Sequence, residues 1–269
     1  YGSGIAQKDL DHKTMDKVLN WLNSSLYNYS TQFNSTTNIT VTLKENAENP
    51  IFLYTNLQAT HNPMVFPDEY KLYLPDDLGT KGLRSENVVN RFDNSLYYID
   101  VQIGRLIEFL KKNNELNNTI IILSSDHGHD LYGLHGTTGH GYSVYDEEIR
   151  VPLMFYFPDM DPKIYNEPVS TIDVLPTVLD IMKLPPQKEF IGAPIKKQER
   201  LIFYLQNHKY GIGMLKNNKK TIIDLNRGLA EVYDLEKDPD ELKNLVLKKN
   251  YDKEILELLM WHYCQINYF

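Results

Sequence analysis

In the first half of this chain, hydrophobic residues follow a helical period in two segments. Apolar side chains recur every three or four positions over residues 16–26 and 88–110, with charged and polar residues between them. This spacing gathers the apolar side chains on one face and predicts an amphipathic helix in each segment. A third helix is predicted from Ser170 to Met182, with Asp173 as a cap at its start and Pro185 just beyond its end.

Three other segments are apolar without polar alternation. This pattern is typical of strands that are buried on both faces of a parallel sheet. The three runs cover residues 51–57, 119–124 and 151–157. Because strands and helices alternate, residues 1–194 are predicted to form an α/β domain with a mostly parallel sheet flanked by helices.

The pattern changes beyond about residue 195. Short apolar runs separated by Asn, Lys and Gly turns predict a small antiparallel sheet, and an amphipathic helix is expected near the end, from about residue 252 to 263. The short runs cover residues 201–205, 210–215, 220–225 and 231–235. Residues 195–269 are therefore predicted to form a second, smaller domain.

Composition narrows the functional classes. The chain has 269 residues, of which 42% are hydrophobic and 24% charged, and its net charge is −8. An acidic chain of this kind gives no indication of nucleic-acid binding. No apolar run approaches the roughly 20 residues that a transmembrane helix needs, so no transmembrane segment is predicted. A single cysteine, Cys264, excludes an intrachain disulfide and a zinc site built from several cysteines.

The glycosylation acceptor pattern Asn-x-Ser/Thr occurs five times. The acceptor residues are Asn23, Asn28, Asn34, Asn38 and Asn117. The pattern predicts a glycoprotein of the secretory pathway, lysosomal or extracellular.

Candidate chemistry follows the apolar run at 119–124. Asp126 and His127 come directly after it, and the loop beyond holds His129, His135 and His140. Ligands of open α/β sheets bind where the chain leaves the carboxyl end of a strand. A carboxylate oxygen beside an imidazole nitrogen is half of a divalent-metal site. A polar turn with Asp as a helix cap is the alternative, and this motif alone leaves both open.

Five segments carry recognisable motifs: residues 50–63 (PIFLYTNLQATHNP), 98–128 ending in Ser-Ser-Asp-His-Gly, 139–153, 172–180 and 232–245 (VYDLEKDPDELKNL). In this order they resemble the sulfatase family of the alkaline-phosphatase-like superfamily. The likeness spans roughly residues 10–250. It implies the corresponding α/β fold and hydrolysis of a sulfate ester through a covalent intermediate. A phosphate ester is the alternative substrate, because the geometry of a tetrahedral anion at a metal serves both.

The resemblance also implies roles for particular residues. Asp126 and His127 would be ligands to a divalent cation, which is calcium in many sulfatases; the imidazole of His127 favours manganese or zinc. His61 and His140 would be catalytic and substrate-binding residues that hold a sulfate oxygen, or in the case of His61 protonate the leaving group. His135 is a further substrate-binding candidate. The acidic run 146–148 is expected to position the loop, with Arg150 as its ion-pair partner.

Two parts of a sulfatase site are absent from the sequence. The family needs an N-terminal strand with an Asp pair for the metal, and a Cys-x-Pro-Ser-Arg segment, or its Ser/Thr equivalent, that carries the nucleophile. The only cysteine, Cys264, is followed by Gln-Ile-Asn. We therefore expect the C-terminal part of a sulfatase-like hydrolase, with a sheet incomplete at one side. The N-terminal half of the same protein, or another chain, would supply the nucleophile.

The alternative is a non-catalytic scaffold with the sulfatase fold, or a subunit of a larger assembly. A scaffold has no physical need for Asp126, His127, His61 and His140 together. Their joint presence favours the hydrolase.

Overall fold

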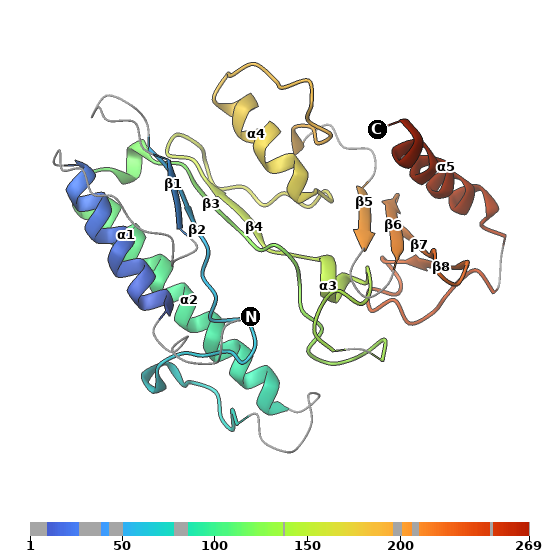
Figure 1. The fold of residues 1–269 in the computed structure, drawn as a ribbon, viewed down its shortest axis with the longest axis horizontal. Coiled ribbons are helices and arrows are strands. Elements are labelled where there is room, and N and C mark those ends of the chain that lie inside the picture. The colour runs from blue at the N-terminus through green and yellow to red at the C-terminus, as the bar shows by residue number, and fades with distance from the viewer. Residues whose placement is uncertain are drawn as a thin grey trace. The chain divides into compact units, whose positions relative to one another are not determined.

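The computed structural model describes residues 10–26, 39–42, 51–77, 86–136, 138–195, 201–205, 210–247 and 250–268. Contacts divide the chain into two compact units. Unit 1 is Tyr1–Ile120 with Phe157–Asp159, and unit 2 is Ile121–Tyr156 with Met160–Phe269. Figure 1 shows the elements in chain order.

Two long helices form the frame of unit 1. They are α1 (Leu10–Leu26) and α2 (Glu86–Lys112), which confirm the two helices predicted from the apolar period; α1 begins six residues earlier than expected. They pack around a buried cluster of Met15, Val18 and Leu22. The strand β2 (Phe52–Thr55) adds Leu53 to this cluster and pairs antiparallel with β1 (Ile39–Thr42). Short 3-10 helices, η2 (Asp68–Tyr70) and η3 (Leu116–Asn118), complete the unit.

Unit 2 begins with a two-stranded ribbon, which is accompanied by three short helices. The strands β3 (Ile121–Ser124) and β4 (Leu153–Tyr156) pair antiparallel. Between them lies α3 (Asp146–Ile149), a single turn, and after β4 come η4 (Thr171–Asp173) and α4 (Val174–Ile181). Asp173 is buried, and its carboxylate accepts the backbone N–H of Ser170 in a capping box at the start of η4. At the N-cap of α4, where the sequence predicted a cap, Asp173 makes no side-chain capping bond.

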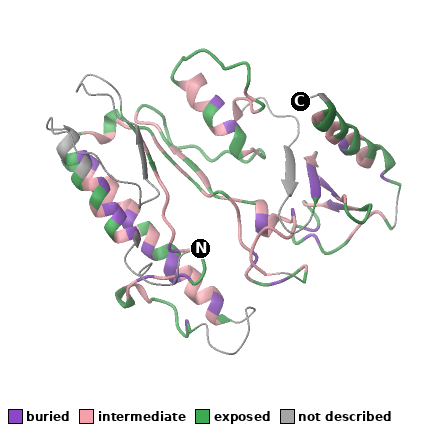
Figure 2. Cartoon of the chain, in the orientation of Figure 1, coloured by how far each residue is buried: buried purple, intermediate pink, exposed green. Residues whose placement is uncertain are grey.

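The C-terminal part of unit 2 is an antiparallel sheet covered by a helix. Its strands, in spatial as well as chain order, are β5 (Leu201–Leu205), β6 (Gly211–Lys216), β7 (Lys219–Asp224) and β8 (Leu229–Asp234). The helix α5 (Asp252–Tyr268) packs Leu258 onto Ile212, Met214 and Ile223. Figure 2 shows that much of β6 and β7 is buried. The sheet and final helix lie within 195–269 as expected, and the domain boundary itself stays a prediction.

The parallel sheet expected from the sequence is not found among the described strands. Every described pair, β3 with β4 included, is antiparallel. Parallel strands are usually joined by a crossover helix, and the only helix described within residues 125–152 is the single turn α3. The apolar runs identified the strands but not their direction. In β3 and β4 half-buried residues alternate with exposed ones, and Met154 is 56% exposed.

Two of the five predicted glycosylation sites lie in described segments. Asn23 is exposed on α1 and Asn117 is exposed in η3, while Asn28, Asn34 and Asn38 lie outside the described residues. Among the helices that the structure describes, none is long and apolar enough to cross a membrane.

Candidate functional site

The loop that leaves β3 folds back on itself. We call residues 125–145 the histidine loop. Asp130 and Gly139 exchange two backbone hydrogen bonds of 2.7 and 2.8 Å, which closes the middle of the loop. Gly139 has a φ of +100°, a conformation that favours glycine. The closure brings His140, next to Gly139, alongside the residues that follow β3.

Asp126 and His127 present two potential metal ligands side by side. The carboxylate Oδ2 of Asp126 lies 3.8 Å from Nε2 of His127. The His127 Nδ1 lies 2.7 Å from the carbonyl oxygen of Gly128, an acceptor to which Nδ1 can donate, and this leaves Nε2 as the ring nitrogen that a cation could bind. Their side chains are 83% and 40% exposed. This donor pair fits two positions on one divalent cation.

A cation bound by Asp126 and His127 would need additional ligands. Across the part of the chain that the structure describes, no group of three His, Cys, Asp or Glu side chains is placed to hold a metal ion. Asp126 and His127 would therefore hold a cation only together with water or with residues outside these segments. A carboxylate with an imidazole suits manganese or zinc better than calcium, which prefers oxygen ligands.

His140 stacks on His127. Their ring centroids are 3.9 Å apart with an interplanar angle of 21°, and His129 tilts against His140 at 5.6 Å. Burial lowers the pKa of His129, and the nearby His140 and His127 lower it further. His127, His129 and His140 thus gather in one cluster, and within it His127 lies beside the Asp126 carboxylate. The sequence singled out His127 and His140 as site residues but not His129.

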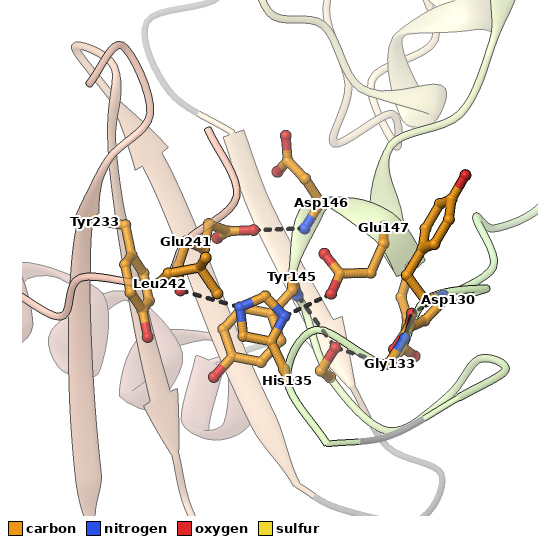
Figure 3. Close-up of polar contacts among 12 residues, drawn as sticks. Asp130, Gly133, His135, Tyr145, Asp146, Glu147, Tyr233, Glu241 and Leu242 are labelled. Atoms are coloured by element: carbon orange, nitrogen blue, oxygen red, sulfur yellow. Dashed lines mark hydrogen bonds and ion pairs between the residues drawn. The ribbon is translucent and has the colours of Figure 1, made fainter. Parts of the chain in front are cut away.

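The fourth histidine of the loop, His135, has a different set of partners. Its side chain is only 9% exposed, and its two ring nitrogens face Glu147 and Glu241 (Figure 3). The ring stacks on Tyr145 with centroids 3.6 Å apart. In this conformation His135 offers no free ring nitrogen to a substrate, and its substrate-binding role stays a prediction.

The acidic run positions the loop, through partners other than the expected one. The Asp146 carboxylate pairs with Lys220 at 2.8 Å, and Glu147 pairs with His135. Glu148 is buried and accepts hydrogen bonds from Tyr142 N and Ser143 Oγ. Arg150 was the wrong partner: it is exposed and forms no ion pair with any residue in the described ranges.

Glycine is required at the third position of the Asp-His-Gly motif. The backbone N–H of Gly128 donates to the carbonyl oxygen of Glu148 at 2.7 Å. A Cβ atom built on Gly128 would lie 2.4 Å from the carbonyl oxygen of Glu147. The close approach of the two backbones ties the start of the histidine loop to α3.

The residues that sequence reasoning missed lie in the C-terminal sheet and the turn after it. Lys220 on β7 is fully buried and pairs with Glu241 at 2.9 Å as well as with Asp146. Glu241 also accepts the backbone N–H of Asp146 at 2.7 Å. Glu231 accepts the hydroxyls of Tyr145 and Tyr233. Glu241 lies within residues 232–245, one of the five segments singled out from the sequence, so a signal for it existed. Lys220, in a short strand, gave none.

The conformation of the segment around Glu241 has a local cause. Asp238 accepts the backbone N–H groups of Leu242 and Lys243, and Asn244 accepts that of Val232. These bonds fold residues 238–244 into a turn against β8. The turn presents Glu241 to Lys220 and to the histidine loop.

His61 lies in unit 1, at the end of the segment that leaves β2. The carboxylate of Asp11 accepts the backbone N–H groups of Gln58 and Ala59 at 2.8 and 2.7 Å, which fixes this segment to α1. Burial raises the pKa of Asp11, and these two hydrogen bonds oppose that rise. His61 itself is exposed, with Nδ1 2.8 Å from the carbonyl oxygen of Asn62. Its catalytic and substrate-binding role stays a prediction.

Comparison with known proteins agrees with these motifs. The sulfatase family model matches residues 7–184, which is well over half of the chain. This segment contains both His61 and the Asp126–His127 pair. The chain belongs to the sulfatase family.

The chain is similar to individual sulfatases in sequence and to solved structures in fold. An arylsulfatase of Clostridium perfringens is 27% identical over 77% of this chain and 51% of its own length. A structure of a protein in complex with its substrate, D-glucosamine-2-N,6-O-disulfate, is 26% identical over 66% of this chain and 42% of that one, with a TM-score of 0.52. The crystal structure of Ps i-CgsB matches 94% of this chain and 54% of that one, with a TM-score of 0.69 at 20% identity, a likeness of fold alone. These neighbours have the α/β fold of the alkaline-phosphatase-like superfamily.

The matches cover only part of each relative. The chain spans about half the length of the curated relatives it matches, from 38% to 52% for the first four. The activity of a whole sulfatase is therefore a matter for the proposal below.

Proposed function

We propose that this chain is part of an enzyme that hydrolyses a sulfate ester at a divalent-metal site, and that Asp126 and His127 are two of the metal ligands. The observation that carries the proposal is the pairing of Asp126 Oδ2 with His127 Nε2 at 3.8 Å, directly after a strand in a member of the sulfatase family. A divalent cation there would polarise the ester and neutralise charge that develops on its oxygens.

The histidines of this chain would hold and orient the substrate. His140 stacks on His127, so its ring lies beside the proposed ligand pair and would hold a sulfate oxygen. His61 is exposed and would hold another oxygen or protonate the leaving group. An imidazole suits proton transfer because its ordinary pKa lies near neutral pH.

The nucleophile and the remaining metal ligands would come from residues other than Asp126, His127, His140 and His61. The known relatives are about twice the length of this chain. We propose that a further segment of the same protein, or another chain, supplies the nucleophile and the Asp pair. Its strands would also cover apolar side chains such as Met154, which β3 and β4 leave exposed.

The substrate class is a sulfate ester on a sugar or an aromatic group. The named relatives include an arylsulfatase and a protein whose substrate is a disulfated glucosamine. A phosphate ester is the alternative. Exposed Asn23 and Asn117 are in keeping with a glycoprotein of the secretory pathway, lysosomal or extracellular. A mass shift on enzymatic deglycosylation of the secreted protein would test that route.

The metal proposal is tested by calorimetric titration of the chain with calcium, manganese and zinc chlorides. Asp126→Asn should weaken binding by at least about tenfold, since changes even at groups behind the ligands cost that much. Asp161→Asn, an exposed carboxylate of the same unit, is the matched control and should bind as the wild type does. Equal affinity in all three proteins would exclude Asp126 as a ligand.

The reaction is tested with aryl sulfate and aryl phosphate esters, with the chain alone and after addition of the separately produced N-terminal half of a related sulfatase. We expect little turnover by the chain alone, because a covalent catalyst without its nucleophile loses several orders of magnitude. Sulfate hydrolysis by the combined protein would support the proposal. Hydrolysis of phosphates only, or no hydrolysis with metal bound, would favour a phosphoester hydrolase or a scaffold.

A further inference from the structure

The ring of His135 meets a hydrogen-bond acceptor at each nitrogen. Nδ1 lies 2.5 Å from the carboxylate Oε1 of Glu147, and Nε2 lies 3.0 Å from the backbone carbonyl oxygen of Glu241. Figure 3 shows the ring between these two groups. Neither a carboxylate nor a carbonyl can donate a proton, so both hydrogen bonds require the ring to donate from both nitrogens. A neutral imidazole donates from only one.

We propose that His135 is a doubly protonated positioning residue that fastens the histidine loop to the turn carrying Glu241. We call His135, Glu147 and Glu241 the His135 bridge. The bridge joins residues 106 positions apart in the chain, one in the loop and one after the C-terminal sheet. This role concerns the folded chain itself and does not depend on sulfate-ester hydrolysis.

The conformation of Glu241 supports this role. Its φ is +53°, in the left-handed region where a residue other than Gly, Asn or Asp is uncommon. Such a conformation persists where the surroundings over-determine it. Here the side chain is fixed by Lys220 and by Asp146 N, and the backbone carbonyl is left facing His135. The strained backbone therefore serves to aim one acceptor at the ring.

The groups around the ring favour its charged form. Burial by itself lowers the pKa of His135, but the hydrogen bonds to Glu241 and Glu147 and the charges of these two residues outweigh burial and raise it. The charged and titratable groups that surround the bridge from α3, β7, β8 and the following turn are Tyr145, Asp146, Glu147, Lys220, Glu231, Tyr233 and Glu241. Four are carboxylates and one is a lysine, which itself pairs with two of the carboxylates.

The bridge has a consequence for the site. His140 is five residues from His135, and the exchange of hydrogen bonds between Asp130 and Gly139 links their positions. Fixing His135 to the C-terminal sheet therefore restricts the loop that carries His140. We expect amide exchange at Gly139 and its neighbours to rise when the bridge is removed.

The protonation state is measured directly by long-range proton–nitrogen NMR of the full chain labelled at histidine, with the His135 signals identified by their absence in His135→Gln. We expect both ring nitrogens to be protonated at neutral pH. Glu147→Gln should lower the pH at which His135 loses its proton, and Glu236→Gln, an exposed carboxylate of the same unit, should not. A single protonated nitrogen at neutral pH, or equal shifts in both variants, would overturn the proposal.

Stability against pH is a second measurement. Because the folded pKa of His135 is raised, its contribution is fully present below the unfolded pKa and is lost as pH rises through the folded pKa. The difference in melting temperature between the wild type and His135→Gln should therefore be largest in acid and shrink in base. His262→Gln, on α5 of the same unit, serves as the histidine control. A difference that is constant with pH, or that grows in base, would contradict a charged bridge.

Discussion

Replacement of Lys220 by methionine should be among the most damaging single changes in unit 2. The Lys220 side chain is 0% exposed and lies 2.8 Å from Asp146 Oδ1 and 2.9 Å from Glu241 Oε1. Methionine has a similar length and keeps the packing against β6 and β8. It removes the ammonium charge that pairs with both Asp146 and Glu241. Two carboxylates would then face each other across an apolar side chain.

The expected cost follows from the exposure of the two carboxylates. Asp146 is 28% exposed and can regain some hydration, whereas Glu241 is 0% exposed and cannot. Removal of one partner from a buried ion pair costs about 3–5 kcal/mol, because the other charge stays buried and unpaired. In a protein of this size each kcal/mol lowers the melting temperature by about 2–4 °C.

The hairpin β6–β7 provides a matched control. Lys216 pairs with both carboxylate oxygens of Glu257 at 2.9 and 3.0 Å, but the two side chains are 42% and 25% exposed. An ion pair at this level of exposure is worth about 0–1 kcal/mol, because solvent screens it. Lys216→Met should therefore lose much less stability than Lys220→Met in urea unfolding followed by circular dichroism.

Two further results would separate charge from packing. Acid should reduce the loss in Lys220→Met, because protonation of Glu241 removes the unpaired charge; burial already raises the pKa of this residue. The double variant with Glu241→Gln should regain part of the stability. If Lys220→Met lost no more than Lys216→Met, or if its loss were independent of pH, the assignment of a buried ion pair would be wrong.

Three other substitutions test backbone contacts, one of them as a control. Gly128→Ala should destabilise the protein by about 1–3 kcal/mol through overpacking, because the new Cβ would lie 2.4 Å from the Glu147 carbonyl oxygen. Gly104→Ala in α2, where nothing lies within 4 Å of an added Cβ, should instead stabilise it by roughly 0.5–1 kcal/mol; equal effects in thermal unfolding would refute the clash. Asp11→Ala should expose the amides of Gln58 and Ala59 to hydrogen exchange, and unchanged exchange would show that Asp11 does not fix the segment before His61.

The sequence alone determined several parts of this protein. The apolar period located α2, and the unbroken apolar runs located β3 and β4, because side-chain spacing directly reflects helical or extended backbone. It also placed Asp126 and His127 directly after a strand, since both lie within three residues of Ser124. The order of the motifs further identified the sulfatase family, which the family model confirms.

Only the tertiary structure decided which residues meet. The antiparallel pairing of β3 with β4, the pairing of Lys220 with Asp146 across 74 residues, and the contact of His135 with Glu241 across 106 join distant parts of the chain. An apolar pattern states which side of an element is buried but not what lies against it. Lys220 is the clearest case, because a lysine in a strand is ordinarily exposed and only the approach of two carboxylates makes its burial favourable.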